Sequence, residues 1–187
     1  MNNPWLNWSV FLSIGKHARF CGDLRSVRFT WERPRKSASA EKVFIEESFL
    51  RFLHLAQELA HAPLKTLRAV KAQDANILYA LAEFENRVAA EFEMNEALPD
   101  SMPDVFFIKA NFTGGHVTNQ PLGGHFDEPG SIFADENGLR LFTVDSCDPE
   151  IAGGVYDTVM RIAELEGAPE IPDAEKLLAA VRKAVYR

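Results

Sequence analysis

The sequence has little cysteine and no long apolar run, and both absences limit what the protein can be. Cys21 and Cys147 are its only cysteines, which excludes a disulfide framework and predicts two reduced, structural thiols. No apolar segment approaches the roughly 18 residues that a membrane-spanning helix needs. The first residues also lack the basic and apolar regions of a signal peptide. We therefore expect a cytoplasmic protein that does not enter a membrane.

Motifs for nucleotide binding and for nucleophilic catalysis are absent as well. The 11 glycines form no Gly-x-Gly-x-x-Gly loop, and strands do not alternate regularly with helices, so no doubly wound nucleotide-binding fold is predicted. Neither a Gly-x-Ser-x-Gly elbow nor a cysteine-protease signature is present. The net charge of −7 also disfavours nucleic acid, because phosphate contacts supply most of the affinity of such binders.

What the chain does contain is the composition of one ordinary globular domain. Hydrophobic residues make up 47% and charged residues 25% of the 187 residues, which is enough to build a sizeable core. Apolar residues follow period two in some segments and helical periodicity in others, in the order strands, helices, strands, helices. We predict a single α+β domain over residues 1–187, with a mostly antiparallel sheet of about four to six strands and helices packed on it.

The periodicities place these elements along the chain. The alternation from Arg25 to Glu32 predicts an antiparallel strand with one polar face. Residues 39–98 are predicted to be mainly helical, with helices at 45–60, 64–71 and 77–92. The strand region 104–145 includes a strand at 105–112, expected to be buried on both faces, and a hairpin at Asn137-Gly138. Residues 148–187 are predicted to form C-terminal helices, because Asp148-Pro149 and Pro172-Asp173 are typical helix starts.

Positive charge is concentrated near the beginning of the sequence. Residues 1–42 contain eight basic and three acidic residues, a balance of +5, whereas the remaining residues carry −12. Four arginines of this segment could form a surface that binds an acidic partner: Arg25, Arg28, Arg33 and Arg35. The alternative is that they lie against acidic elements of the same chain, which is the common situation for surface charges.

The glycine-rich segment 114–127 is the candidate for a metal site. His125 and Asp127 are two residues apart, and His116 could join them if the loop folds back at its glycines. Two imidazoles and a carboxylate can hold a divalent metal ion. The alternative is a polar surface loop whose histidines have no such role.

A second histidine group occurs on the helix predicted at 45–60. Glu58 and His61 have the Glu-x-x-His spacing of di-iron helices, and His54 lies one turn before Glu58. Only one such motif is present, and the group lies opposite the apolar stripe that contains Phe49 and Phe52. We therefore interpret it as part of a solvated helix face.

The sequence identifies no family, and its functional prediction rests on the charge separation. It favours a small cytosolic binding or regulatory protein that acts through a protein partner, such as a bacterial accessory or toxin-neutralising protein of the immunity type. This interpretation needs no catalysis and no cofactor, and it allows a homo-oligomer. The alternative is a metal-dependent enzyme that holds a divalent ion at His116, His125 and Asp127.

Overall fold

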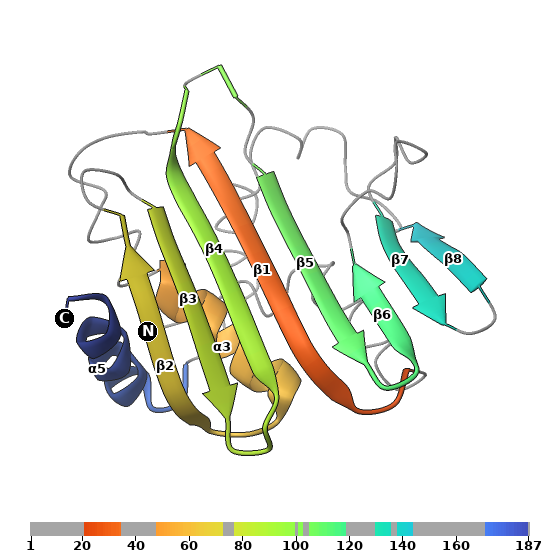
Figure 1. Cartoon of the computed structure of the whole chain (residues 1–187), viewed down its shortest axis with the longest axis horizontal. Helices are drawn as coiled ribbons and strands as arrows, with labels where there is room; N and C mark the ends of the chain where they lie inside the picture. Colours follow the sequence, from red (N-terminus) through yellow and green to blue (C-terminus); the bar gives the residue numbers. More distant parts are fainter. Residues whose placement is uncertain are drawn as a thin grey trace.

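The structure, a computed structural model, is built on one continuous β-sheet backed by a long helix (Figure 1). It describes residues 21–34, 48–72, 77–99, 101–102, 105–118, 130–135, 138–143 and 171–186. The sheet has eight strands in the order β2-β3-β4-β1-β5-β6-β7-β8. Their bounds are β1 Leu24–Pro34, β2 Leu64–Lys71, β3 Ile77–Phe84, β4 Ala89–Leu98, β5 Val105–Phe112, β6 Gly115–Thr118, β7 Gly130–Asp135 and β8 Gly138–Thr143.

The strand β1 lies near the middle of the sheet and has a different kind of neighbour on each side. It pairs in parallel with β4, so that Phe29 lies beside Phe92, and antiparallel with β5, so that Trp31 lies beside Phe106. All other strand pairings in the described residues are antiparallel. The α+β class is therefore confirmed. The prediction of a mostly antiparallel sheet of four to six strands is corrected to a mixed sheet of eight.

Within the described residues, two helices accompany the sheet, α3 at Leu50–Ala60 and α5 at Ala174–Val185. In Figure 1, α3 passes behind the strands and α5 lies beside β2 at one edge. The predicted helices are confirmed at these positions, including the buried Leu177 and Val181 of α5. The predicted helix start at Asp148 lies outside the described residues.

The core lies between α3 and the sheet, and its centre is aromatic. Phe52 of α3 stacks on Phe106 at 5.6 Å between ring centroids and meets the edge of Trp31 at 5.4 Å. Phe49 meets Phe92 edge-on at 5.2 Å. Such tilted and offset pairs add to the free energy gained by burying the rings. The period-two pattern of β1 is what turns Phe29 and Trp31 toward this helix.

The segment 64–98 forms three strands, so the prediction of a mainly helical segment at 39–98 is wrong there. Leu78, Ala80, Ala82 and Phe84 alternate with more exposed residues along β3. The alanines and glutamates of this segment favour helix intrinsically, but tertiary packing overrides such propensities. Small side chains suit these positions because Ala82, beside Ala90 on β4, lies on the face of the sheet that bears the core.

A turn at Asn86 ends β3 and fixes the position of α3. Asn86 Oδ1 accepts a hydrogen bond from the Val88 backbone N–H at 3.2 Å, while Nδ2 donates to the Ala60 carbonyl at 2.7 Å. The second bond satisfies one of the carbonyls left open at the end of a helix. Arg87 adopts a left-handed conformation at φ 68°. One side chain thus forms the turn and ties it to α3.

The strand region 105–143 agrees with the sequence prediction in its elements but not in one burial pattern. Residues 105–112 form a strand, and β7 and β8 form the predicted hairpin, with Asp135 beside Gly138. The expectation that β5 is buried on both faces is wrong. Phe106 and Ile108 face the core, whereas Phe107 is half-buried on the opposite face. The strand β6 separates β5 from the hairpin.

Candidate functional site

The helix α3 carries a buried histidine paired with a carboxylate. His54 Nε2 lies 3.4 Å from Glu58 Oε1, one helical turn away, and the histidine side chain is 1% exposed while that of Glu58 is 45% exposed. Burial lowers the pKa of His54, and the charge and hydrogen bond of Glu58 act against this shift. The imidazole is therefore neutral at pH 7, the form that can accept a proton.

Other polar side chains are buried on this helix and just before it. Arg51 of α3 is 8% exposed, and Ser48, which precedes the helix, is 1% exposed. At 100° per residue, Arg51, His54 and Glu58 lie on one side of α3, away from the face that carries Phe49 and Phe52. Buried polar groups need partners and are costly to keep. Their concentration on one helix makes this stripe the best candidate for a chemical site among the described residues.

The burial of His54 corrects the prediction that the histidine group lies on a solvated helix face. The spacing of His54 and Glu58 was visible in the sequence, but its surroundings were misjudged. Leu50 and Leu55 are also completely buried, and they lie on either side of the polar stripe. These flanking leucines were the available sequence signal that this side of the helix is covered. His61 ends the helix in an exposed, left-handed conformation at φ 51° and takes no part in the pair.

A second buried polar group joins the ends of β1 and β4. Arg33, 6% exposed, forms an ion pair through Nη2 with Glu96, 1% exposed, and its guanidinium lies 4.7 Å from the centre of the Trp31 ring. Both side chains lie on the core side of the sheet. In the alternation of buried residues, Arg33 follows Trp31 along β1 and Glu96 follows Met94 along β4. A buried pair of this kind restricts which register two strands can adopt, although its net contribution to stability is small.

Three of the four arginines predicted to form one binding surface are described, and they do not share one face. Arg25 and Arg28 are exposed, Arg33 faces inward, and Arg35 lies outside the described residues. Arg28 bonds to Glu93 at 3.1 Å and approaches Glu91 at 3.9 Å, both on the neighbouring strand β4. Arg28 and Arg33 are thus partners of acidic residues in the same chain.

Of the three residues predicted as metal ligands, the structure describes His116. His116 lies in β6, beside Asn111 of β5. Burial, followed by the charge of Lys109, lowers the pKa of His116. His125 and Asp127 lie outside the described residues, so their predicted metal site stays a prediction. Within the described ranges, no three histidine, cysteine or acidic side chains are placed to hold a metal ion.

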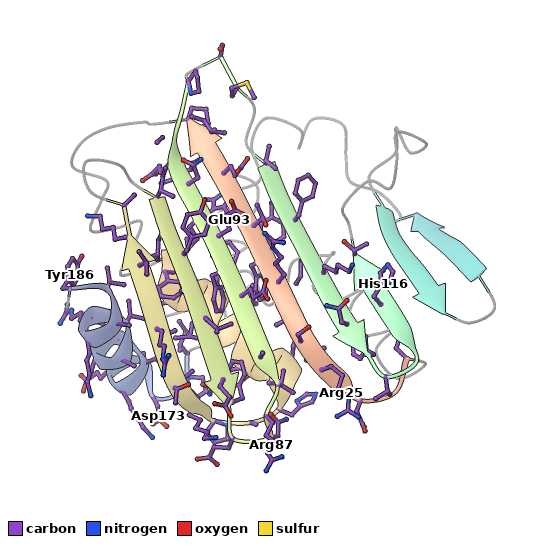
Figure 2. The ribbon with its side chains drawn as sticks, viewed as in Figure 1. Arg25, Arg87, Glu93, His116, Asp173 and Tyr186 are labelled. Carbon is purple, nitrogen blue, oxygen red and sulfur yellow. The ribbon has the colours of Figure 1, made fainter. Side chains whose placement is uncertain are left out.

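The face of the sheet opposite α3 carries exposed polar and apolar side chains (Figure 2). Tyr79 and Leu81 are each 51% exposed there. Tyr79 Oη donates a hydrogen bond to Glu93 Oε1 at 3.3 Å, and the charge of Glu93 is the main cause that raises the pKa of Tyr79.

In the described part of the chain, no helix is both long enough and apolar enough to cross a membrane.

Comparison by sequence finds no relative, whereas comparison by structure finds many. No family model matches the chain, and no curated protein matches it. The fold is similar to that of UDP-N-acetylglucosamine 3-dehydrogenase from Acidithiobacillus ferrooxidans, with a TM-score of 0.67 and 15% identity over 97% of this chain and 60% of that one. It is also similar to an oxidoreductase from Agrobacterium radiobacter in complex with NAD+, L-tartaric acid and magnesium (TM-score 0.66, 11% identity, 98% of this chain and 60% of that one).

A third structure shows the same relationship. Biliverdin reductase from a Synechocystis species, in complex with biliverdin and NADP+, gives a TM-score of 0.63 at 14% identity over 100% of this chain and 62% of that one. The chain thus spans about three fifths of the length of these three structures. The prediction of a small regulatory protein that acts through a protein partner is wrong on this finding, because the fold is one that oxidoreductases and dehydrogenases carry.

Proposed function

We propose that this chain is the sheet domain of an oxidoreductase, the part that holds the substrate and moves its proton. The observation that carries the proposal is the match of nearly the whole chain to about three fifths of several oxidoreductases. Fold likeness alone does not determine function. The pair formed by the buried His54 and the half-exposed Glu58 supports the proposal independently, because it is a group suited to proton transfer.

The described residues do not fit a nicotinamide dinucleotide. Such cofactors bind where a glycine-rich turn leads from a parallel strand into a helix. The sequence contains no Gly-x-Gly-x-x-Gly, and the one parallel pairing among the described strands, β1 with β4, belongs to an otherwise antiparallel sheet. The proposal therefore assigns the nucleotide to another polypeptide segment and the substrate to this one.

The chemistry assigned to this chain is proton transfer at a hydroxyl group. When an alcohol is oxidised to a carbonyl, a hydride leaves carbon and the hydroxyl proton must leave oxygen. A neutral imidazole can take that proton, and a neighbouring carboxylate orients the ring and stabilises the imidazolium that forms. His54 and Glu58 have these two roles in the proposal, because the first is buried and neutral and the second is beside it.

The test is ligand binding by wild-type protein and by His54→Gln. L-tartrate and myo-inositol serve as hydroxylated probes, measured by thermal shift and by the NMR signals of the His54 ring. We expect at least one probe to raise the melting temperature of the wild type by linkage and to shift the His54 signals. The variant should lose this response.

The matched control is His61→Asn, which changes the exposed histidine at the end of the same helix and keeps a residue that tolerates its left-handed backbone. It should respond to the probes like the wild type. Equal stabilisation of the wild type and His54→Gln would contradict the role of His54. Saturable binding of NADH to this chain, followed by its fluorescence, would contradict the assignment of the nucleotide to another segment.

A further inference from the structure

A cavity of about 530 Å³ opens between β2 and α5 at the edge of the sheet, and Gln57 of α3 also lines it, whereas His54 and Glu58 do not. This volume is within the range of sites for small molecules. In Figure 2, the labels of Asp173 and Tyr186 mark the two ends of α5 along this edge. The apolar part of its wall is formed by Leu177, Ala180 and Ala184 of α5 and by Leu67 and Ala69 of β2.

The charges around this cavity are not those of the chain as a whole. The protein carries a net charge of −7, yet the residues that line the cavity include four cations and one acid: Lys65, Arg68, Lys176, Lys183 and Asp173. Lys65 is neutralised by Glu83 at 2.8 Å. Among the described residues, no ion pair or hydrogen bond engages the side chains of Arg68, Lys176 or Lys183. Lys176 and Lys183 of α5 thus border this hollow without an ion pair to any described residue, in a protein that is acidic overall.

The spacing of the cations restricts the shape of a ligand. Lys176 and Lys183 are seven residues apart on one side of α5, which places them about 10 Å apart along the helix axis. Between them the wall is apolar, formed by Leu177 and Ala180, and Leu67 faces it from β2. Arg68 does not join these two lysines, because it lies beside Leu81 in the strand register and its side chain belongs to the open face of the sheet.

We propose that this cavity binds a small organic anion with an acidic group at each end of its body. The two ends would meet Lys176 and Lys183, and the body would lie on the apolar wall between them. Carboxylate and phosphate groups share the chemistry that these cations recognise. Asp173 lies nearest the Lys176 end and weakens binding there. The proposal does not depend on the proposed oxidoreductase function, because none of its residues belongs to the His54–Glu58 pair.

The test is calorimetric titration at low ionic strength with anions that differ in length and in the number of charged ends. Suberate carries two carboxylates on a long apolar chain, succinate two on a short chain, and octanoate one on a long chain. Fructose 1,6-bisphosphate replaces the carboxylates by phosphates. We expect suberate or the bisphosphate to bind at least fivefold more tightly than succinate and octanoate, and binding to weaken as salt is added. Tight binding of suberate would identify the acidic groups as carboxylates, and tight binding of the bisphosphate would identify them as phosphates.

Three variants locate the binding. Lys183→Glu should weaken it about tenfold, whereas Asp173→Asn should strengthen it and keeps a residue that tolerates the left-handed backbone at φ 52°. Arg25→Glu makes the same charge change on the exposed end of β1 and should leave binding unchanged. Equal binding of all four anions, the bisphosphate included, would overturn the proposal. So would equal effects of Lys183→Glu and Arg25→Glu, or the absence of binding by every anion.

Discussion

His54 and Glu58 are 3.4 Å apart on successive turns of α3, and one is buried while the other is nearly half exposed. Burial lowers the pKa of His54, and Glu58 partly opposes that effect. Replacing Glu58 by glutamine removes the opposing charge but keeps a hydrogen-bonding group of similar size. The pKa of His54 in Glu58→Gln should therefore fall further below its ordinary value. A pH titration of the imidazole signals by NMR measures this shift, and an unchanged pKa would show that the two groups are not coupled.

The same lowered pKa predicts how stability depends on pH. Because the pKa of His54 is lower in the folded protein than in the unfolded chain, the unfolded chain binds more protons as the pH falls below about 6.5. The free energy of unfolding should therefore decrease between pH 7 and pH 5. His116, whose pKa is also lowered, acts in the same direction. Denaturant melts of the wild type, His54→Gln and His116→Gln measure the effect, and each variant should show a shallower loss than the wild type.

Two neighbouring phenylalanines of β5 test which face of the sheet bears the core. Phe106 is 7% exposed and stacks on Phe52, whereas Phe107 is half-buried on the other face. Phe106→Ala should lower the free energy of unfolding by about 3–5 kcal/mol, and Phe107→Ala by only about 1 kcal/mol. The two substitutions remove the same atoms from adjacent positions, so each is the control for the other. Equal losses in urea melts would mean that both faces of β5 are covered.

The strands of the sheet differ in how well the sequence predicts them. The strand β1 was predictable because valine, phenylalanine and tryptophan at 27, 29 and 31 alternate with polar residues, and period two has one physical meaning. The strands β3 and β4 were not, because alanine and glutamate favour helix locally. Their strand form depends on the pairing of β4 with β1 and on cover by α3, which are contacts between distant segments. Asn86 was the local clue, since its side chain forms the turn between them.

The candidate site was predictable in its residues but not in its environment. The spacing of His54 and Glu58 predicts that they meet on one side of a helix. It does not reveal whether that side is covered, and the polar residues beside it indicated solvent. Only the burial of His54 turns an ordinary surface pair into a group with a lowered pKa. The parallel pairing of β1 with β4 was equally hidden, because it joins segments more than 60 residues apart.

The exposed Tyr79 reports on the charges of the open face. The charge of Glu93 is the main cause that raises the pKa of Tyr79, and the phenol also donates a hydrogen bond to this carboxylate. Glu93→Gln should therefore lower the pKa of Tyr79 toward its ordinary value. The pKa of Tyr79 is measured by ultraviolet absorbance in alkaline titrations. Subtracting the titration of Glu93→Gln/Tyr79→Phe from that of Glu93→Gln leaves the signal of Tyr79 without those of the other two tyrosines. Glu91→Gln serves as the control, because Glu91 does not contribute to the shift, and an equal fall in that variant would contradict the assignment.

Two of the ion pairs between β1 and β4 allow a direct comparison of a buried and an exposed pair. Arg33 and Glu96 are both buried, whereas Arg28 and Glu93 join the same strands on the open face. Glu96→Ala leaves the Arg33 charge buried without its carboxylate, which should cost about 3–5 kcal/mol of unfolding free energy. Glu93→Ala should cost at most about 1 kcal/mol, because solvent screens the exposed pair. The double variant Arg33→Met/Glu96→Leu should recover most of the loss, since apolar residues of similar volume can replace a buried pair. Urea melts could instead show the double variant to be less stable than Glu96→Ala. In that case the stacking of Arg33 on Trp31 stabilises the fold by more than the removal of the two buried charges does.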